Sequence, residues 1–241
     1  MVSWSTAPLD AIVLAGGQGR RLGGLNKAAL IGPDGRTALA VTLDVCWQAG
    51  ARRVVVVGPV DENLATLAPL ALHPGPGDRG PGEATGQATW FQTGKPSPTE
   101  RRIGLVQEVP PRSGPARAIA AGVAVLGQPA GDADNAAMLV LACDTPGAGA
   151  VVPILLAQPR RGEGAVAWSD GHLQWLLGVY AATALRAACQ RLPAMPSGRG
   201  EPLRSLLGQL DWHQVDVPKT GAEDLDTAAD LDRWGFAPPA L

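Results

Sequence analysis

The sequence has little excess charge of either sign. It holds 20 Lys and Arg residues against 22 Asp and Glu residues, which gives a formal net charge of −2 over 241 residues. Nucleic acids and anionic membranes attract proteins through a general excess of positive charge. This balance argues against both kinds of partner, so any binding of phosphate groups must depend on a local cluster of cations.

Long apolar runs and a leader pattern are also missing. No run reaches the roughly 18 to 20 residues that a membrane-spanning helix needs. The first residues, Met-Val-Ser-Trp-Ser, lack the basic and then apolar order of a secretory signal. We therefore expect a cytoplasmic protein.

Cysteine and histidine are scarce, with three of each. Cys46, Cys143 and Cys189 are odd in number and widely spaced, which argues against a disulfide framework or a Cys-x-x-Cys metal site. The histidines are equally scattered, so a zinc cluster is not expected. We interpret Cys143 as a small buried residue of a strand.

Apolar residues, by contrast, are abundant, at 46% of the chain against 17% charged residues. This composition is typical of a folded protein with a large core, and the length fits one domain of ordinary size. Apolar runs predict buried strands, and helical spacing with a Gly or Pro at one end predicts helices between them. The strands are expected at 11–15, 53–58, 103–108 and 138–143, and the helices at 37–49 and 116–126.

This alternation predicts an α/β fold with a mostly parallel sheet and helices on both faces. Residues 73–102, rich in Pro and Gly, are expected to form an irregular insertion within a single domain of residues 1–241. The last third predicts a hairpin, two helices, an edge strand and a final helix capped by Thr227 with Asp230. These elements are expected at 164–168 with 174–180, at 181–192 and 203–210, at 212–217, and up to residue 234.

A glycine-rich, cationic loop follows the first strand. Glycines allow a close approach of the backbone to a ligand, and clustered cations repel one another unless an anion is expected. Exposed amides together with fixed positive charge favour a polyphosphate ligand. Lys27 is followed by Ala28 where a Walker loop needs Ser or Thr, and the third glycine of a dinucleotide fingerprint is missing.

Asp144 directly follows the strand expected at 138–143. A carboxylate at the carboxyl end of a buried parallel strand points into the crevice where open α/β sheets bind ligands. Mg²⁺ binds one or two carboxylates together with substrate phosphates, so Asp144 is a candidate magnesium ligand. The alternative is an aspartate that caps the next helix.

The loop reads Leu14-Ala-Gly-Gly-x-x-x-Arg21-Leu-Gly-Gly-x-x-Lys27, and it resembles the signature loop of the MobA-like NTP transferases, the molybdenum cofactor guanylyltransferases and their relatives. In that family the loop wraps the phosphates of the nucleotide, and its lysine contacts them. The resemblance implies a three-layer, Rossmann-like nucleotidyltransferase fold, with Lys27 and Arg21 on the phosphates. It also implies nucleotide binding by Leu14, Ala15, Gly16, Gly17 and Gly19. The family usually has an acidic residue before the lysine, where this chain has Asn26.

Two further segments carry the resemblance. Residues 142–146, Ala-Cys-Asp-Thr-Pro, resemble the family's metal-binding motif, which implies Mg²⁺ on Asp144. Glu108, ahead of Gly114 and Pro115, stands where the family has an acidic nucleotide-binding residue, although aspartate is more frequent there.

The acceptor side is implied by weaker likenesses. Residues 174–180 are similar to the family segment near the acceptor, which gives Gly178 an acceptor-side role. Asp224 and Asp226 stand where the family usually has asparagines, and they could contact a metal or the acceptor. We expect Asp226 mainly to cap the last helix. Arg199 and Arg204 are candidates for an anionic acceptor, with plain solvation as the alternative.

The resemblance implies transfer of GMP from GTP to the phosphate of molybdopterin, with release of pyrophosphate, and contacts with molybdoenzymes or cofactor-delivery proteins. A cytidylyltransferase for the same cofactor is the nearest alternative. Its relatives often carry Asp-x-Asp-Thr-Pro, close to residues 224–227, but more often have Ala-Ala-Gly where this loop has Ala-Gly-Gly. A non-catalytic nucleotide-binding module also stays open. A dinucleotide-dependent oxidoreductase would need an acidic residue where Gly58 and Pro59 stand.

Overall fold

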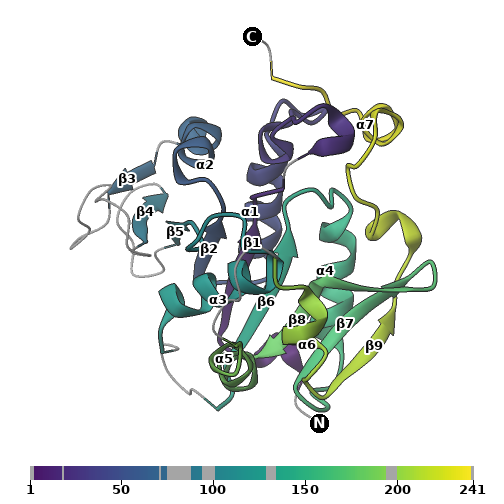
Figure 1. The fold of residues 1–241 in the computed structure, drawn as a ribbon. Helices are drawn as coiled ribbons and strands as arrows, with labels where there is room; N and C mark the ends of the chain where they lie inside the picture. The colour runs from purple at the N-terminus through teal and green to yellow at the C-terminus, as the bar shows by residue number, and fades with distance from the viewer. Residues whose placement is uncertain are drawn as a thin grey trace.

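One sheet runs through the part of the chain that the structure describes (Figure 1). The structure is a computed structural model, and it describes residues 3–17, 19–70, 72–74, 88–93, 101–128, 134–193 and 200–239. Nine strands within these ranges follow the order β3-β4-β5-β2-β1-β6-β8-β7-β9. Their bounds are β1 Leu9–Leu14, β2 Arg53–Val57, β3 Leu72–Pro74, β4 Thr89–Thr93, β5 Arg102–Val106, β6 Ala137–Ala142, β7 Gly164–Ser169, β8 His172–Ala181 and β9 Trp212–Asp216.

The centre of the sheet is parallel. β5, β2, β1 and β6 are neighbours that run in one direction, with Ala11 of β1 opposite both Val54 of β2 and Leu139 of β6. Of the nine strands, β4 and β8 run against the rest. The prediction of a mostly parallel sheet is confirmed, and the carboxyl ends of the four central strands meet at one edge.

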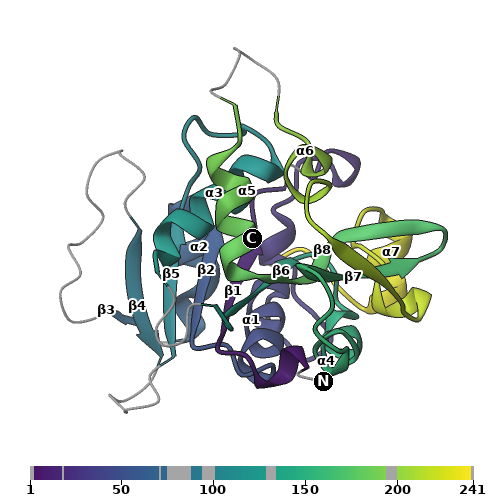
Figure 2. The ribbon, with the colours of Figure 1, turned by 90° about the horizontal axis from the view of Figure 1, so that it is seen from below.

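Helices cover both faces of the sheet. Their bounds are α1 Ala38–Gln48, α2 Val60–Leu67, α3 Pro115–Leu126, α4 Ala148–Ala157, α5 Ala182–Gln190, α6 Leu203–Leu207 and α7 Ala228–Trp234. Figure 2 shows α1 and α4 on one side of the sheet and α3 and α5 on the other. The fold class predicted from the sequence, with three layers, is confirmed.

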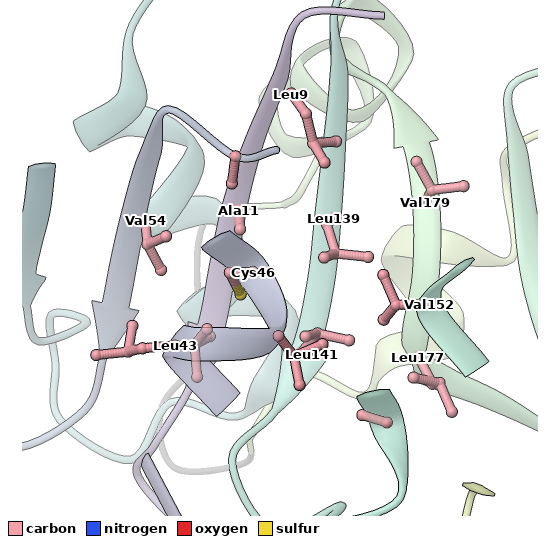
Figure 3. Close-up of a cluster of buried hydrophobic side chains, with 14 of the residues drawn as sticks. Leu9, Ala11, Leu43, Cys46, Val54, Leu139, Leu141, Val152, Leu177 and Val179 are labelled. Carbon is pink, nitrogen blue, oxygen red and sulfur yellow. The ribbon is translucent and has the colours of Figure 1, made fainter. Parts of the chain in front are cut away.

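Alternating strand side chains fill the two interfaces between these layers. Ala11 and Val13 of β1 belong to the buried cluster under α1 and α4, whereas Ile12 belongs to the cluster under α3, α5 and α6. Figure 3 shows the first cluster, with Cys46 of α1 in front of β1 near Ala11 and Leu139 on the neighbouring strand β6. A strand buried on both faces must be apolar throughout, which explains the continuous runs in the sequence.

Most predicted elements are present within one to three residues of their expected bounds. The Thr37 side chain accepts a hydrogen bond from the Ala40 amide at the start of α1, and Pro115 opens α3. The hairpin forms as β7 and β8, and β9 lies at the sheet edge. Helices α2 and α4 were not predicted from the sequence.

The expectation of an irregular insertion at 73–102 is corrected. Trp90 and Phe91 lie in β4, which pairs antiparallel with β5, and β3 pairs with β4 in turn. The sheet edge at β5 supplies hydrogen-bonding partners that local sequence preference does not reveal. Residues 75–87 and 94–100 lie outside the described residues.

The remaining sequence expectations concern cysteines and membranes. Cys46, Cys143 and Cys189 are all free thiols in the structure. Among the described residues, no helix has the length and apolar character needed to cross a bilayer.

Leu139 provides a test of the core. It is fully buried in central strand β6, so Leu139→Ala should lower the free energy of unfolding by about 2–5 kcal/mol through lost burial and the cavity left behind. Urea denaturation measures this change. The control is Val109→Ala, because Val109 is 69% exposed and should shift stability by less than about 0.5 kcal/mol. Equal effects of the two variants would contradict the assigned core.

Candidate functional site

The glycine-rich loop turns back on itself directly after β1. Gly19 has φ +51°, and a Cβ atom there would overlap the carbonyl oxygen of Leu25. The chain then forms two short 3₁₀ turns, Arg20–Leu22 and Lys27–Ala29. Gly19 thus shapes the loop and is not itself a lining residue of either cavity described below, whereas Gly17 and Gly24 face open space.

This loop forms one wall of a cavity of about 750 Å³ at the carboxyl edge of the sheet. The opposite wall consists of Gly58, Pro59 and Glu62 at the start of α2, together with the segment that follows β5. The lining residues are Ala15, Gly16, Gly17, Arg20, Gly24, Asn26, Gly58, Pro59, Glu62, Gln107, Glu108, Pro111 and Arg112. The volume and the exposed loop backbone suit a nucleotide.

A smaller and more apolar cavity of about 300 Å³ lies beside the first. Its polar end is formed by Lys27 and Asp144, and its walls include Leu14, Val57, Pro115, Ala118, Cys143 and Leu176. Gly16, Gly17, Glu108 and Arg112 line both cavities. The two cavities therefore share the glycine loop as their border.

Lys27 connects this loop to two carboxylates. Its Nζ donates a hydrogen bond to Oδ2 of Asp144 at 2.7 Å and a second one to Oδ1 of Asp226. Arg21 binds the other oxygen of Asp226, with an Nη1 to Oδ2 distance of 3.1 Å. The Lys27 side chain is only 11% exposed, so its charge interacts with these carboxylates in a poorly solvated place.

The backbone explains how these distant residues meet. The Cys143 amide donates to the Leu14 carbonyl at 3.1 Å, which sets the end of β6 against the end of β1. The Leu225 amide donates to the Asp144 carbonyl at 2.8 Å, which fixes the 224–226 segment beside Asp144. A third contact joins them, from Oγ1 of Thr145 to Oδ1 of Asp224 at 2.8 Å.

The local charges shift two pKa values. Burial alone would lower the pKa of Lys27, but the attraction and hydrogen bonds of Asp144, followed by those of Asp226, raise it above its ordinary value. Burial, and then the negative charge of Asp144, raises the pKa of Asp224 to about 6, although solvent still reaches that residue. Lys27 is therefore cationic at neutral pH.

The structure excludes one alternative about helix capping, for Asp144, and corrects one expectation, for Asp226. Helix α4 begins at Ala148 with Gly147 as its cap, so Asp144 does not cap it and is free to face Lys27. Helix α7 is capped by Thr227 in a capping box with Asp230, so Asp226 directs its carboxylate to Lys27 and Arg21. The Thr227 hydroxyl accepts the hydrogen bond from the Asp230 amide at the start of α7, so Asp226 is not needed as a cap.

The other predicted residues divide into two groups. Leu14, Ala15, Gly16, Gly17 and Glu108 line the cavities. Gly178 instead lies inside β8, buried against the ring of Tyr180, and Leu176 reaches the smaller cavity in its place. Arg204 is exposed on α6, and Arg199 lies outside the described residues.

Three residues of the site, Arg112, Asn26 and Thr145, were assigned no role from the sequence. The Arg112 amide donates to Oε1 of Glu108 at 2.9 Å, which orients that carboxylate between the two cavities. Asn26 donates from Nδ2 to Oε2 of Glu62 at 3.2 Å, so the loop is tied to α2. Thr145 directly follows Asp144 in the sequence. This position was the only feature of the sequence that pointed to a role for Thr145 in the site.

The carboxylates near Lys27 have the chemistry of magnesium ligands. Oxygens of Asp144 and Asp226 converge on one cationic nitrogen, which shows that this place suits a cation. In the described ranges, no three His, Cys, Asp or Glu side chains are grouped to hold a metal ion by themselves. The pair fits Mg²⁺ that is shared with phosphates and water, since Mg²⁺ takes one or two carboxylates in such sites.

The family match, together with the cationic glycine loop and the carboxylate at the carboxyl edge of a parallel sheet, shows that the protein is a nucleotidyltransferase. Residues 11–215 match the MobA-like NTP transferase domain, and the chain belongs to this family. A search of curated proteins found no match.

Solved structures share the fold at low sequence identity. A nucleotidyl transferase from Methanothermobacter is similar with a TM-score of 0.60 and 17% identity, over 94% of this chain and 95% of that one. Rv0371c from Mycobacterium tuberculosis has a TM-score of 0.60 and 19% identity, over 94% and 97%. The 2-C-methyl-D-erythritol 4-phosphate cytidylyltransferase from Thermus thermophilus has a TM-score of 0.53 and 17% identity, over 94% and 96%.

Asp224 gives a prediction on the pH dependence of stability. Its pKa in the folded protein, about 6, lies above the ordinary 3.8, so the folded state binds more protons between these values and loses stability as pH rises through them. The free energy of unfolding of the wild type should therefore fall relative to that of Asp224→Asn between pH 4 and pH 7. The expected fall is only on the order of 1 kcal/mol, because solvent screens the charge of an exposed carboxylate.

Urea denaturation of both proteins across this pH range measures the difference. The control is Asp232→Asn, which removes an exposed carboxylate of α7 and should show no such trend. A wild type that gains stability over Asp224→Asn with rising pH would show that the assigned pKa has the wrong direction.

Proposed function

We propose that the protein transfers GMP from GTP to the phosphate of molybdopterin bearing its molybdenum, with release of pyrophosphate. The observation that carries this proposal is the position of the half-buried Lys27 ammonium between the glycine loop and Asp144. A polyphosphate on that loop would lie within reach of Lys27 and of the exposed Arg21 guanidinium.

The chemistry requires no nucleophilic side chain. An oxygen of the acceptor phosphate attacks the α-phosphorus of the nucleotide, the bond from that phosphorus to the bridging oxygen of the β-phosphate breaks, and pyrophosphate leaves with the electron pair. The acceptor phosphate is already an anion near neutral pH, so a strong general base is not needed. Catalysis then depends on positioning and charge neutralisation by Lys27 and Arg21.

Asp144 and Asp226 would hold Mg²⁺ in this proposal. When bound, the ion neutralises charge on the reacting phosphates. This chain's own contribution is to keep the carboxylates of Asp144 and Asp226 together beside Lys27, through the bond between the Leu225 amide and the Asp144 carbonyl.

The two cavities support a division of donor and acceptor. The larger one has the exposed loop amides and would take the nucleotide. The smaller one has apolar walls and would take the ring system of an acceptor whose phosphate points to Lys27.

The second candidate is cytidylyl transfer to the same acceptor. It is favoured by the acidic pair Asp224 and Asp226, and the Thermus thermophilus neighbour is named a cytidylyltransferase. The Ala15-Gly16-Gly17 order favours the guanylyl assignment instead. A module that only binds nucleotide does not need both Lys27 and Asp144. The contact between these two residues therefore favours an enzyme over a non-catalytic binding module.

The donor is tested by incubating the protein with Mg²⁺, molybdenum-loaded molybdopterin and each NTP separately. We expect pyrophosphate release with GTP and at least tenfold less with CTP, ATP or UTP, on the order of 1.4 kcal/mol of discrimination. Release with CTP alone would overturn the guanylyl assignment. No release with any NTP and an intact acceptor would favour the binding module.

The site itself is tested by Lys27→Ala and Asp144→Ala. Each should reduce turnover by at least ~10²–10³-fold, because a charge that stabilises the transition state is lost. Thermal unfolding should show that both variants remain folded. The matched control is Lys219→Ala, which breaks an exposed ion pair with Asp170 and should leave turnover unchanged. Near-full activity in Lys27→Ala or Asp144→Ala would exclude that residue from the site.

A further inference from the structure

A buried carboxamide without a hydrogen-bond partner lies behind the nucleotide cavity. Asn63 of α2 is 1% exposed, and neither its Nδ2 nor its Oδ1 finds a partner. Leaving such a group unsatisfied is costly, because it has given up its bonds with water. Asn63 takes no part in the chemistry proposed above, and its helix packs onto the sheet with Leu67 in the core.

Asn63 faces the junction where the glycine loop meets the end of β2. A Cβ atom placed on Gly58 would lie 2.8 Å from the carbonyl oxygen of Ala15 and 3.0 Å from Nδ2 of Asn63. The carbonyl and the carboxamide therefore converge on the same point beside Gly58. The Ala15 amide donates a hydrogen bond to the Val57 carbonyl at 2.8 Å, which fixes the peptide unit before Ala15. The orientation of the next peptide unit, after Ala15, is not set by this bond.

That peptide unit joins Ala15 to Gly16, and Gly16 lines both cavities. In a trans peptide the carbonyl and the N–H point in opposite directions. A carbonyl of Ala15 that faces Gly58 and Asn63 therefore sends the N–H of Gly16 away from them. An N–H presented in this way is the kind of donor that binds phosphate oxygens in a glycine loop.

We propose that Asn63 is a positioning residue that donates a hydrogen bond to the Ala15 carbonyl when nucleotide binds and so holds the Gly16 N–H toward the phosphates. The donor and its acceptor both lie within 3.0 Å of the same point beside Gly58, and no hydrogen bond joins them in the structure. This inference rests on the proposed nucleotide site, and it assigns a role to a residue of α2 outside the signature loop.

The test compares the affinities of Asn63→Leu for GTP and for guanosine, measured by calorimetry. Leucine has a similar volume and removes the hydrogen bond, so we expect the Kd for GTP to rise roughly tenfold. The affinity for guanosine, which has no phosphate, should be unchanged. The unfolding temperature without ligand should stay equal or rise, because an unsatisfied polar group has been removed.

Thr66→Val is the matched control, since Thr66 is buried on the same helix and its hydroxyl bonds to the Glu62 carbonyl within α2. It should bind GTP as the wild type does. If Asn63→Leu does not fold, Asn63→Ala replaces it with the same expectation. The inference about Asn63 would be overturned if a folded Asn63 variant bound GTP as tightly as the wild type does. It would also be overturned if the variant lost the same factor of affinity for GTP and for guanosine. Either result would leave the proposed function standing. A wild-type protein that binds no NTP would overturn the proposed function as well.

Discussion

The ammonium group of Lys27 holds the site together. It binds Asp144, 117 residues away in sequence, and Asp226, 199 residues away. Without a cation between them, these carboxylates would repel each other at the edge of the sheet, and the glycine loop would lose its anchor there. The same contact keeps Lys27 charged, so the residue that orders the site is also the one suited to bind phosphate.

The order of the strands creates the place for this contact. After β1, the chain passes through α1 to β2 on one side, and it returns through α3 on the opposite face to form β6 on the other side of β1. Connections that leave a strand toward both sides open a crevice at its carboxyl end. The loop after β1 and Asp144 after β6 meet there through Lys27, and the Leu225 amide holds the segment before α7 against the Asp144 carbonyl.

The sequence predicts those parts of the site that depend on neighbouring residues. Continuous apolar runs locate β1 and β6, and their ends locate the glycine loop and Asp144. The capping box of Thr227 with Asp230 was predicted and forms, but Asp226 was also assigned to helix capping, because its contact with Lys27 joins residues 199 positions apart and leaves no local signal. β4 was missed because it forms by pairing with β5, and α4 because Pro153 and flanking glycines hide its helical pattern. Contacts such as that of Arg112 with Glu108 depend on a loop shape that no periodicity reports.

The glycine loop thus borders a nucleotide-sized cavity and a smaller apolar one, and Lys27 and Asp144 lie at the polar end of the smaller cavity. In this account Lys27 exchanges its carboxylate partners for phosphate oxygens when substrate binds. A crystal structure of the protein with GTP and Mg²⁺ tests this most directly. The account predicts phosphates on the glycine loop, with Nζ of Lys27 within hydrogen-bond distance of a phosphate oxygen. A nucleotide bound elsewhere, with Lys27 still paired to Asp144 and Asp226 alone, would contradict it.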